Sequence, residues 1–192
     1  MKVLIVAATK SEIISKKVRE YPVLITGVGM VNTAIKLTRE LIKKKYDLVI
    51  NMGVAGSFTD NLKIGSVVEV VEDNFSEIGY ENNLGFSKFI DFDLPTKYLN
   101  TPTTYLRHVR AITVNTVHGM TKTINQIVNR QNPEIESMEG ASVFQVCEEF
   151  NITCLQIRSI SNFVEERNNE NWDLDLAIRN LNSEVEKIIY SL

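Results

Sequence analysis

The sequence predicts one α/β domain, residues 1–192, in which a central, mostly parallel sheet is covered by helices on both faces. The main observation is alternation, because short apolar runs rich in branched residues alternate with helical patterns along most of the chain. The length of 192 residues and the hydrophobic content of 44% are sufficient for a full core. Several apolar runs also end in glycine or polar residues, and ligands bind beyond the carboxyl ends of strands in such sheets.

The first half of the chain is predicted to alternate strands with helices. The expected elements are strands over residues 3–8, 23–26, 47–52 and 65–72, and helices over residues 11–19 and 31–44. The run at 3–8 is continuously apolar, which is typical of a parallel strand covered on both faces. The side chains expected to face the core from the two helices are those of Ile13, Ile14, Val18, Ile35, Leu41 and Ile42.

The second half continues this alternation after a long excursion. Residues 73–102 have weak periodicity, and such an excursion is more often functional or interfacial than idle, so the aromatic-rich residues 75–92 are a candidate dimer surface. Strands are then expected over 111–114 and 153–160, and helices over 121–129, 139–150 and 174–190. We expect Ser137 to cap the helix over 139–150.

Composition and charge exclude several classes of function. The 21 basic and 24 acidic residues are interspersed and give a net charge of −3, so nucleic-acid binding is not expected. The first apolar run is too short for a signal peptide or a membrane span, so no membrane association is expected. Cys147 and Cys154 lack the spacing of a metal site or a redox motif, which favours reduced, buried thiols in a cytoplasmic protein.

The glycine-rich strand exits have two open interpretations. Gly53, Val54, Ala55 and Gly56 follow a buried strand, where small residues either let backbone amides approach a ligand or form a tight turn. The other glycine segment, 27–29, does not complete a dinucleotide-binding motif, since the sixth position is asparagine. A dehydrogenase is therefore disfavoured.

Two glutamates are candidate catalytic residues. Glu12 lies just past the first strand, where a carboxylate can take a proton from water, although a glutamate in a helical first turn is favoured in any case. Glu139 begins a predicted helix and has the same structural explanation. Its neighbours, Met138 and Gly140, are apolar or small, so an enclosed Glu139 would need a partner such as the hydroxyl groups of a ligand.

Three further polar residues lie at or near strand ends. Asn162 either reads a polar ligand edge or caps a turn, and His118 either lines a pocket or belongs to a plain loop. Arg158 lies inside a strand, and a buried guanidinium there is expected to pair with a carboxylate and hold the site in shape. His108 is expected to be solvated.

Five segments match the landmarks of one superfamily in the expected order, and together they cover nearly the whole chain: VLIVAATKSE, ITGVGMVNTA, INMGVAGSF, IGSVVEV and ESMEGASVFQVCEEFNI..LQIRSIS. On these segments the chain resembles the purine nucleoside phosphorylase and nucleosidase superfamily. Within it, SNFVEERNNENWDLDLAIRNLN and ITVNTVHG look most like the futalosine hydrolases, which remove hypoxanthine from futalosine in menaquinone biosynthesis. The resemblance implies a three-layer αβα fold, no metal or organic cofactor, and a homodimer or larger homo-oligomer.

The resemblance also implies roles for particular residues. Glu12 occupies the place of the acid that activates water, and Glu139, preceded by Met138, matches the pair that lies under the ribose. Asn162 stands where adenine-specific nucleosidases carry an aspartate that protonates the base, and Val54 stands where they commonly have serine. The remaining residues implied in substrate binding are Gly53, Ala55, Gly56, Val117, His118 and Phe163.

The asparagine favours a 6-oxopurine leaving group. Hypoxanthine presents acceptors at both N7 and O6, to which the Asn162 amide can donate, whereas adenine presents an acceptor and a donor. A site built for one edge leaves a buried polar group unpaired against the other, which discriminates strongly.

Other activities remain open at this point. Phosphorylases specific for 6-oxopurines also use asparagine, although the only arginines before residue 100, Arg19 and Arg39, lie on predicted helices away from the strand exits. The reaction predicted is therefore hydrolysis of futalosine by water, with methylthioadenosine or adenosylhomocysteine hydrolysis and phosphorolysis as alternatives. A purine-binding module without catalytic activity is the alternative from another class, and the presence of both glutamates argues against it.

Overall fold

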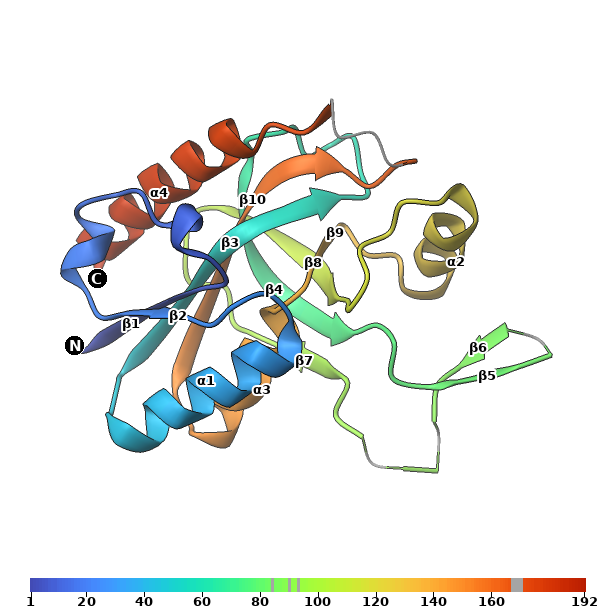
Figure 1. Ribbon diagram of the computed structural model, residues 1–192, viewed down its shortest axis with the longest axis horizontal. Coiled ribbons are helices and arrows are strands. Elements are labelled where there is room, and N and C mark those ends of the chain that lie inside the picture. The colour runs from blue at the N-terminus through green and yellow to red at the C-terminus, as the bar shows by residue number, and fades with distance from the viewer. Residues whose placement is uncertain (84, 90, 93, 167–170) are drawn as a thin grey trace.

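The computed structural model describes residues 1–83, 85–89, 91–92, 94–166 and 171–192 (Figure 1). The strands are β1 (Val3–Ala7), β2 (Val23–Ile25), β3 (Leu48–Ser57), β4 (Val67–Phe75), β5 (Tyr80–Asn82), β6 (Gly85–Ser87), β7 (Lys97–Leu99), β8 (Arg107–Thr113), β9 (Ile135–Ser137) and β10 (Thr153–Phe163). The helices are α1 (Met30–Lys43), α2 (Thr121–Gln131), α3 (Gly140–Glu149) and α4 (Leu174–Ser191), together with the single-turn 3-10 helices Lys10–Glu12 and Val18–Glu20.

The main sheet is mixed and mostly parallel, as predicted. Parallel pairs join β1 to β2, β1 to β3, β3 to β10, β4 to β8 and β8 to β9, whereas β10–β4, β3–β9 and β4–β7 are antiparallel. Because β3 pairs with both β10 and β9, the strands β3, β10, β4, β8 and β9 form a closed ring, from which β1 and β2 extend. The strands β5 and β6 form a separate antiparallel pair that projects from the body of the molecule (Figure 1).

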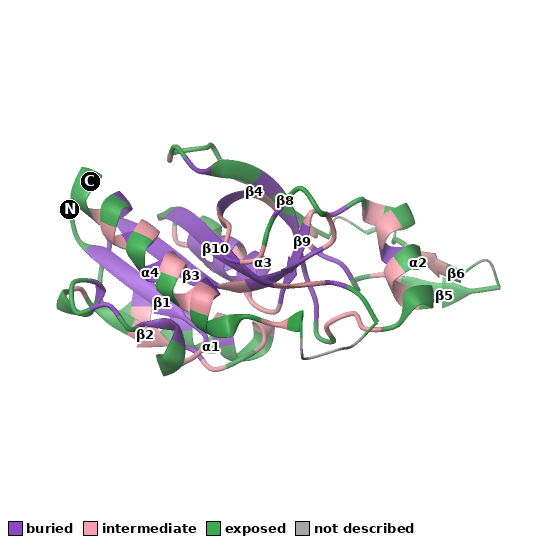
Figure 2. Ribbon diagram, turned by 90° about the horizontal axis from the view of Figure 1, so that it is seen from above, coloured by how far each residue is buried: buried purple, intermediate pink, exposed green. Residues whose placement is uncertain are grey.

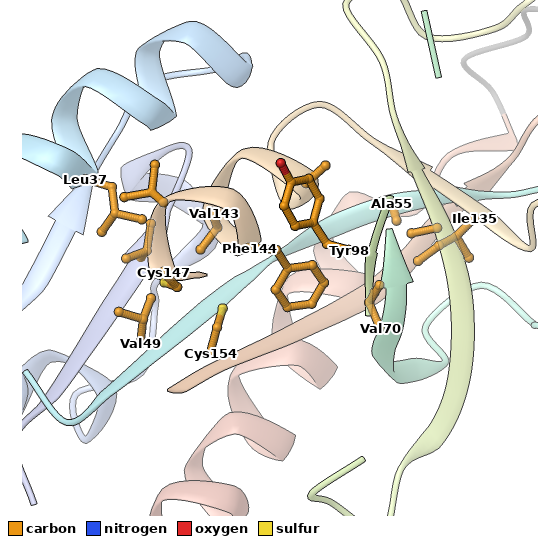
Figure 3. Close-up of a cluster of buried hydrophobic side chains, with 14 of the residues drawn as sticks. Leu37, Val49, Ala55, Val70, Tyr98, Ile135, Val143, Phe144, Cys147 and Cys154 are labelled. Carbon is orange, nitrogen blue, oxygen red and sulfur yellow. The ribbon is translucent and has the colours of Figure 1, made fainter. Parts of the chain in front are cut away.

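Helices cover two faces of this sheet, which confirms the three-layer prediction. On one face, Leu37 of α1 and Phe144 of α3 pack with sheet residues such as Val49 (Figure 3). On the other, Leu181 of α4 packs against a cluster that includes Ile50 of β3. Each such side chain contributes about 1.5–3 kcal/mol when it is fully buried. Figure 2 shows that the strands of the main sheet are largely buried while the helices carry exposed residues.

The helix predicted over residues 11–19 is wrong, because this segment forms the two short 3-10 helices instead. The side-chain Oδ1 of Asn182, a buried residue of α4, accepts hydrogen bonds from the backbone N–H groups of Ile14 and Ser15, both at 3.0 Å. The amide nitrogen of Asn182 donates to the backbone oxygen of Glu12 at 2.9 Å. A tertiary contact therefore takes the backbone groups that a continuous helix would have paired internally.

The predicted inner face of α1 is partly wrong. Leu41 is buried, but Ile35 and Ile42 are 47% and 71% exposed, and the buried positions are Thr33, Leu37 and Leu41. These three positions are four residues apart and form one stripe, so the face of α1 is set by what lies beneath it. The interpretation of residues 53–56 as a turn is also wrong, since they continue strand β3.

Two other expectations concern the aromatic-rich residues 75–92 and the two cysteines. Phe75 does not belong to an exposed aromatic surface, because β4 extends to it and its ring packs edge-on against Tyr98 in the core. Cys147 and Cys154 are free and buried, and lie together in the core (Figure 3). None of the helices in the described ranges has the length and apolar character needed to cross a membrane.

Candidate active site

Glu12 ends the first 3-10 helix and points its carboxylate at strand β3. Its Oε2 accepts hydrogen bonds from the backbone N–H of Thr9 at 2.8 Å and from the Thr9 hydroxyl at 3.1 Å. Its Oε1 lies 3.4 Å from the backbone nitrogen of Val54, which donates to it. The carboxylate is therefore buried and held from two sides, at the end of β1 and beside the middle of β3.

Arg158 lies next to Glu12 because of the pairing of β10 with β3, in which Arg158 is opposite Gly53. A Cβ atom at Gly53 would lie 3.0 Å from Oε1 of Glu12 and 3.1 Å from Nη1 of Arg158, so both groups fill the space that a side chain would take. The guanidinium is fully buried and donates from Nη2 to Oδ1 of Asn51 at 2.5 Å. Its burial is as predicted, although the direct partner is this amide.

Glu139 is the N-cap residue of α3, and its carboxylate reaches the loop before α1. Its Oε1 accepts a hydrogen bond from the backbone N–H of Gly29 at 2.9 Å, where Gly29 adopts a φ of 95° that favours glycine. Burial raises the pKa of Glu139, while the Gly29 N–H and the charge of Arg158 oppose the increase and the charge of Glu12 adds to it.

The positive charge of Arg158 interacts with the negative charges of both glutamates. Burial lowers the pKa of its guanidinium, and the negative charges of Glu139, Glu12 and Asp73 oppose that change. We call Glu12, Glu139 and Arg158 the polar floor; its two carboxylates can accept hydrogen bonds from the hydroxyl groups of a ligand.

A buried network of hydrogen bonds, formed by Thr113, Asp73 and Gln156, holds the start of α3 in place. The backbone N–H of Ala141 donates to Oγ1 of Thr113 at 2.8 Å, and this hydroxyl lies 3.0 Å from Oδ1 of Asp73. Gln156 donates to the other oxygen of Asp73 at 3.1 Å, while burial raises the pKa of Asp73 to about 6. A Cβ atom at Gly140 would lie 2.1 Å from the oxygen of Gln156, so only glycine fits where α3 begins.

Asn162 lies farther along β10, beyond a β-bulge between Ile160 and Asn162. Its Oδ1 accepts a hydrogen bond from the Ser161 hydroxyl at 2.7 Å, and its Nδ2 donates to the backbone oxygen of Phe163 at 2.9 Å. Arg158 precedes it by four residues, about 13 Å along an extended strand. The structure thus brings Glu12 and Glu139 together around Arg158 and places Asn162 at the far end of the same strand.

The other predicted pocket residues fall into two groups. Val117 and Met138 are half-buried and pack, with Phe58, against an apolar cluster formed by Ile112, Val114 and Ile127. On strands β3 and β10, Val54 and Phe163 are half-buried and Ala55 is buried. Met138 directly precedes Glu139, so this apolar cluster adjoins the polar floor.

Glu136, which no sequence pattern indicated, holds the predicted pocket residue His118. Glu136 is buried on β9, and its two oxygens accept from the backbone N–H of His118 at 2.9 Å and lie 2.6 Å from its Nδ1. A Cβ atom at Gly56 would lie 3.6 Å from Cγ of Glu136 and 3.2 Å from Nδ2 of Asn162. In the sequence, Glu136 is only an acidic residue three positions before Glu139. Such a residue does not by itself indicate a functional role.

His118 also lines a cleft of about 720 Å³ between α2 and the β5–β6 pair. Its lining residues are Glu77, Gly79, Tyr80, Glu81, Gly85, Phe86, His118, Thr123, Gln126, Ile127, Asn129 and Arg130. Within the ranges that the structure describes, no group of three or more histidine, cysteine, aspartate or glutamate residues is arranged to hold a metal ion.

Two curated relatives of this chain share one name. The chain is similar to a 5′-methylthioadenosine/S-adenosylhomocysteine nucleosidase of Exiguobacterium, with 27% identity over 177 residues that cover 84% of this chain and 75% of the relative. It is also similar to the nucleosidase of the same name from Shewanella oneidensis, with 31% identity over 151 residues that cover 71% of this chain and 64% of the relative.

Solved structures with the same fold include both kinds of nucleosidase considered above. A Neisseria meningitidis 5′-methylthioadenosine/S-adenosylhomocysteine nucleosidase in complex with methylthio-immucillin-A matches with a TM-score of 0.84 at 20% identity, covering 100% of both chains. The native futalosine hydrolase of Helicobacter pylori matches with a TM-score of 0.85 at 19% identity, covering 100% of this chain and 98% of the other.

The family model described as the phosphorylase superfamily matches residues 7–190, and the residues that build the polar floor all lie inside this match. The match spans nearly the whole chain, and the protein therefore belongs to the phosphorylase superfamily.

Proposed function

We propose that this protein is a purine nucleosidase, which hydrolyses the N-ribosidic bond of its substrate with water as the only co-reactant. The observation that carries the proposal is the arrangement of Glu12 and Glu139 around buried Arg158, beside Gly53. The names of the curated relatives support a nucleosidase over a phosphorylase. We further propose futalosine as the substrate, which would place the reaction in menaquinone biosynthesis.

The ribose is proposed to lie on the polar floor. Glu139 accepts hydrogen bonds from the ribose hydroxyls and stabilises the positive charge that develops on the sugar as the bond to the base breaks. Glu12 orients a water molecule and takes its proton as the water attacks the sugar. Arg158 keeps the two carboxylates in place without contacting the substrate. Such charge stabilisation typically contributes about 3 kcal/mol per well-placed group.

The purine base is proposed to lie toward Asn162. The segment of β3 from Gly53 to Gly56 spans about 10 Å, a length that one nucleoside can bridge. Asn162 adjoins Gly56 and carries an amide that can donate to N7 and O6 of hypoxanthine. In this pose the amide exchanges its hydrogen bond to the Phe163 oxygen for one to the base. Backbone groups near residues 115–119 complete this end.

The second candidate activity is hydrolysis of methylthioadenosine or adenosylhomocysteine. The names of the curated relatives favour it, since both name that substrate pair. Asn162 opposes it, because adenine-specific nucleosidases carry an aspartate at the corresponding position.

One experiment separates these activities. The purified protein is incubated with futalosine, inosine and methylthioadenosine, with and without phosphate, and the released bases and sugars are identified. Our proposal expects hypoxanthine and free sugar from futalosine, independent of phosphate. Release of adenine alone would instead support the second candidate, a requirement for phosphate with ribose 1-phosphate as product would identify a phosphorylase, and no turnover would support a binding module.

Asn162→Asp is expected to shift preference toward adenine-bearing nucleosides. A protonated aspartate can donate to N7 of adenine and accept from its amine, so the kcat/KM ratio of adenine to hypoxanthine nucleosides should rise about tenfold or more. Steady-state kinetics on both substrates measures the ratio, with Asn125→Asp on the exposed side of α2 as the matched control. An unchanged ratio would remove Asn162 from recognition of the base.

We also propose that the protein forms a homodimer or a larger homo-oligomer through exposed aromatic residues next to the β5–β6 pair. Tyr80, Phe89 and Phe92 form a contact chain, with ring centroids 5.5 and 5.4 Å apart, and Phe92 remains 62% exposed. A cluster of exposed aromatic rings in mutual contact is typical of a protein interface.

Phe92→Ser is expected to shift the protein toward the monomer, because it removes the most exposed ring of this patch. Sedimentation velocity at several protein concentrations measures the change. Tyr190→Ser on α4, which alters a similarly exposed aromatic residue, should leave the association state unchanged. A wild-type protein that is monomeric, or a variant with unaltered association, would contradict this interface.

A further inference from the structure

The side chains of Glu136 and His118 form a pair to which the reaction described so far assigns no chemical step. Glu136 is buried, with 3% of its side chain exposed, and a carboxylate at that depth needs strong partners. Both of its oxygens interact with His118, one with the backbone N–H at 2.9 Å and the other with Nδ1 at 2.6 Å. The pair therefore holds the imidazole ring in one orientation.

This geometry determines which ring nitrogen is available to a ligand. A carboxylate only accepts hydrogen bonds, so Nδ1 of His118 carries a proton directed at Glu136. Phe58 packs edge-on against the ring at 6.1 Å between centroids, and 14% of the side chain is exposed. The reactive position of the ring is therefore Nε2, and it carries a proton when the imidazole is charged.

The pair adjoins the proposed base-binding end of the site. Glu136 and Asn162 both lie around Gly56, and Phe58 shares an apolar cluster with Val117 and Met138, the residue before Glu139. His118 also lines the cleft between α2 and the β5–β6 pair. The charged residues that line this cleft with it are Glu77, Glu81 and Arg130.

The chemistry of the proposed reaction requires a group of this kind. When the N-ribosidic bond breaks, its electron pair goes to the base, and a purine leaves readily only when it gains a proton. The amide of Asn162 donates hydrogen bonds but gives up no proton under ordinary conditions. The acids Glu12 and Glu139 are at the sugar end, so the base end needs another proton donor.

We propose that His118 is this donor and that Glu136 is the residue that positions it, an inference that rests on the proposed nucleosidase function. The bond between C1′ of the sugar and N9 of the base breaks, and its electron pair stays with the base. The proton on Nε2 of His118 passes to N7 of the purine, and the Asn162 amide then donates to O6 alone. Water adds to C1′ and gives its proton to Glu12. Solvent then protonates the imidazole and removes the proton from Glu12, so the enzyme returns to its starting state.

The test compares two leaving groups, one that needs a proton and one that does not. The substrates are the best purine nucleoside of the panel and 4-nitrophenyl β-D-riboside, whose nitrophenolate departs as a stable anion. His118→Gln should lower kcat on the purine nucleoside about a hundredfold and leave kcat on the nitrophenyl riboside within about threefold. His118→Asn, which keeps an N–H group toward Glu136 but lacks Nε2, should show the same selective loss and serves if the glutamine variant does not fold.

Variants of the partner test its positioning role. Glu136→Ala should reproduce the selective loss, and Glu136→Gln, which keeps one acceptor for Nδ1, should restore part of the activity on the purine nucleoside. His108→Gln alters the other histidine, which is exposed near the start of β8, and should change neither rate.

The outcomes separate this inference from the proposed function. A wild-type protein that cleaves no nucleoside would refute the nucleosidase proposal itself. Active wild type with His118 variants that lose both substrates equally, or lose neither, would refute only the role of His118.

Discussion

Glu139→Gln is expected to lower kcat by about a hundred- to a thousandfold while the protein remains folded. Glutamine keeps an oxygen that can accept the hydrogen bond from the backbone N–H of Gly29, so the start of α3 should be preserved. It removes the negative charge that we assign to stabilising the sugar in the transition state. Because this interaction is strongest in the transition state, kcat should fall far more than KM changes.

The measurement is steady-state turnover of the best nucleoside of the panel, together with circular dichroism to confirm the fold. Glu148→Gln provides the matched control, since Glu148 lies on the same helix but is exposed. Near-normal kcat in the Glu139 variant would refute the role of this residue at the ribose.

Arg158→Met should reduce the free energy of unfolding by about 3–5 kcal/mol and also abolish most activity. The guanidinium is fully buried, and its charge is balanced by those of Glu139, Glu12 and Asp73. Methionine fills much of the same space but leaves these carboxylates with no opposing charge. The two glutamates then repel each other at the proposed ribose site, which explains why stability and activity should fall together.

Urea unfolding with a common slope for wild type and variant measures the change in stability. Arg107→Met is the control, because Arg107 is exposed and its ion pair with Glu134, at 3.2 Å, should contribute at most about 1 kcal/mol. If Arg158→Met and Arg107→Met have equal effects, Arg158 does not balance the buried acids.

Local sequence patterns correctly predicted those strands and helices whose burial pattern can be read within the segment itself. The apolar run at the start of the chain became β1, and the branched run ending near Asn162 became β10. The helix predicted over 174–190 became α4, in which Ala177 and Leu181 are buried. In each case the periodicity of burial is a property of the segment itself, so neighbouring segments were not needed to identify it.

Patterns that depend on contacts between distant segments were not predictable. The amide of Asn182 replaces the helix expected at residues 11–19, although 168 residues separate it from Ile14. Similarly, residues 53–56 continue a strand instead of turning, because β10 and β9 supply hydrogen-bonding partners on both sides of β3.

In the candidate site, too, some residues could be predicted from the sequence and others only from the contacts between strands. The residue types that can bind a sugar or activate water are evident at Glu12 and Glu139, because each follows a strand or begins a helix. The partnership of Glu136 with His118 is not evident, since it depends on β9 lying beside β3 and β8.

The main alternation of strands and helices, the family and the positions of Glu12 and Glu139 could thus be predicted from the sequence alone, because each depends on patterns among neighbouring residues. The strands β5, β6, β7 and β9 could not be predicted in this way. Only the tertiary structure decided that Gly53 and Gly56 leave space for side chains from other segments of the chain. It also decided that Arg158 lies among three carboxylates. Both results follow from strand register, in which a shift of one residue would turn each of these side chains to the opposite face.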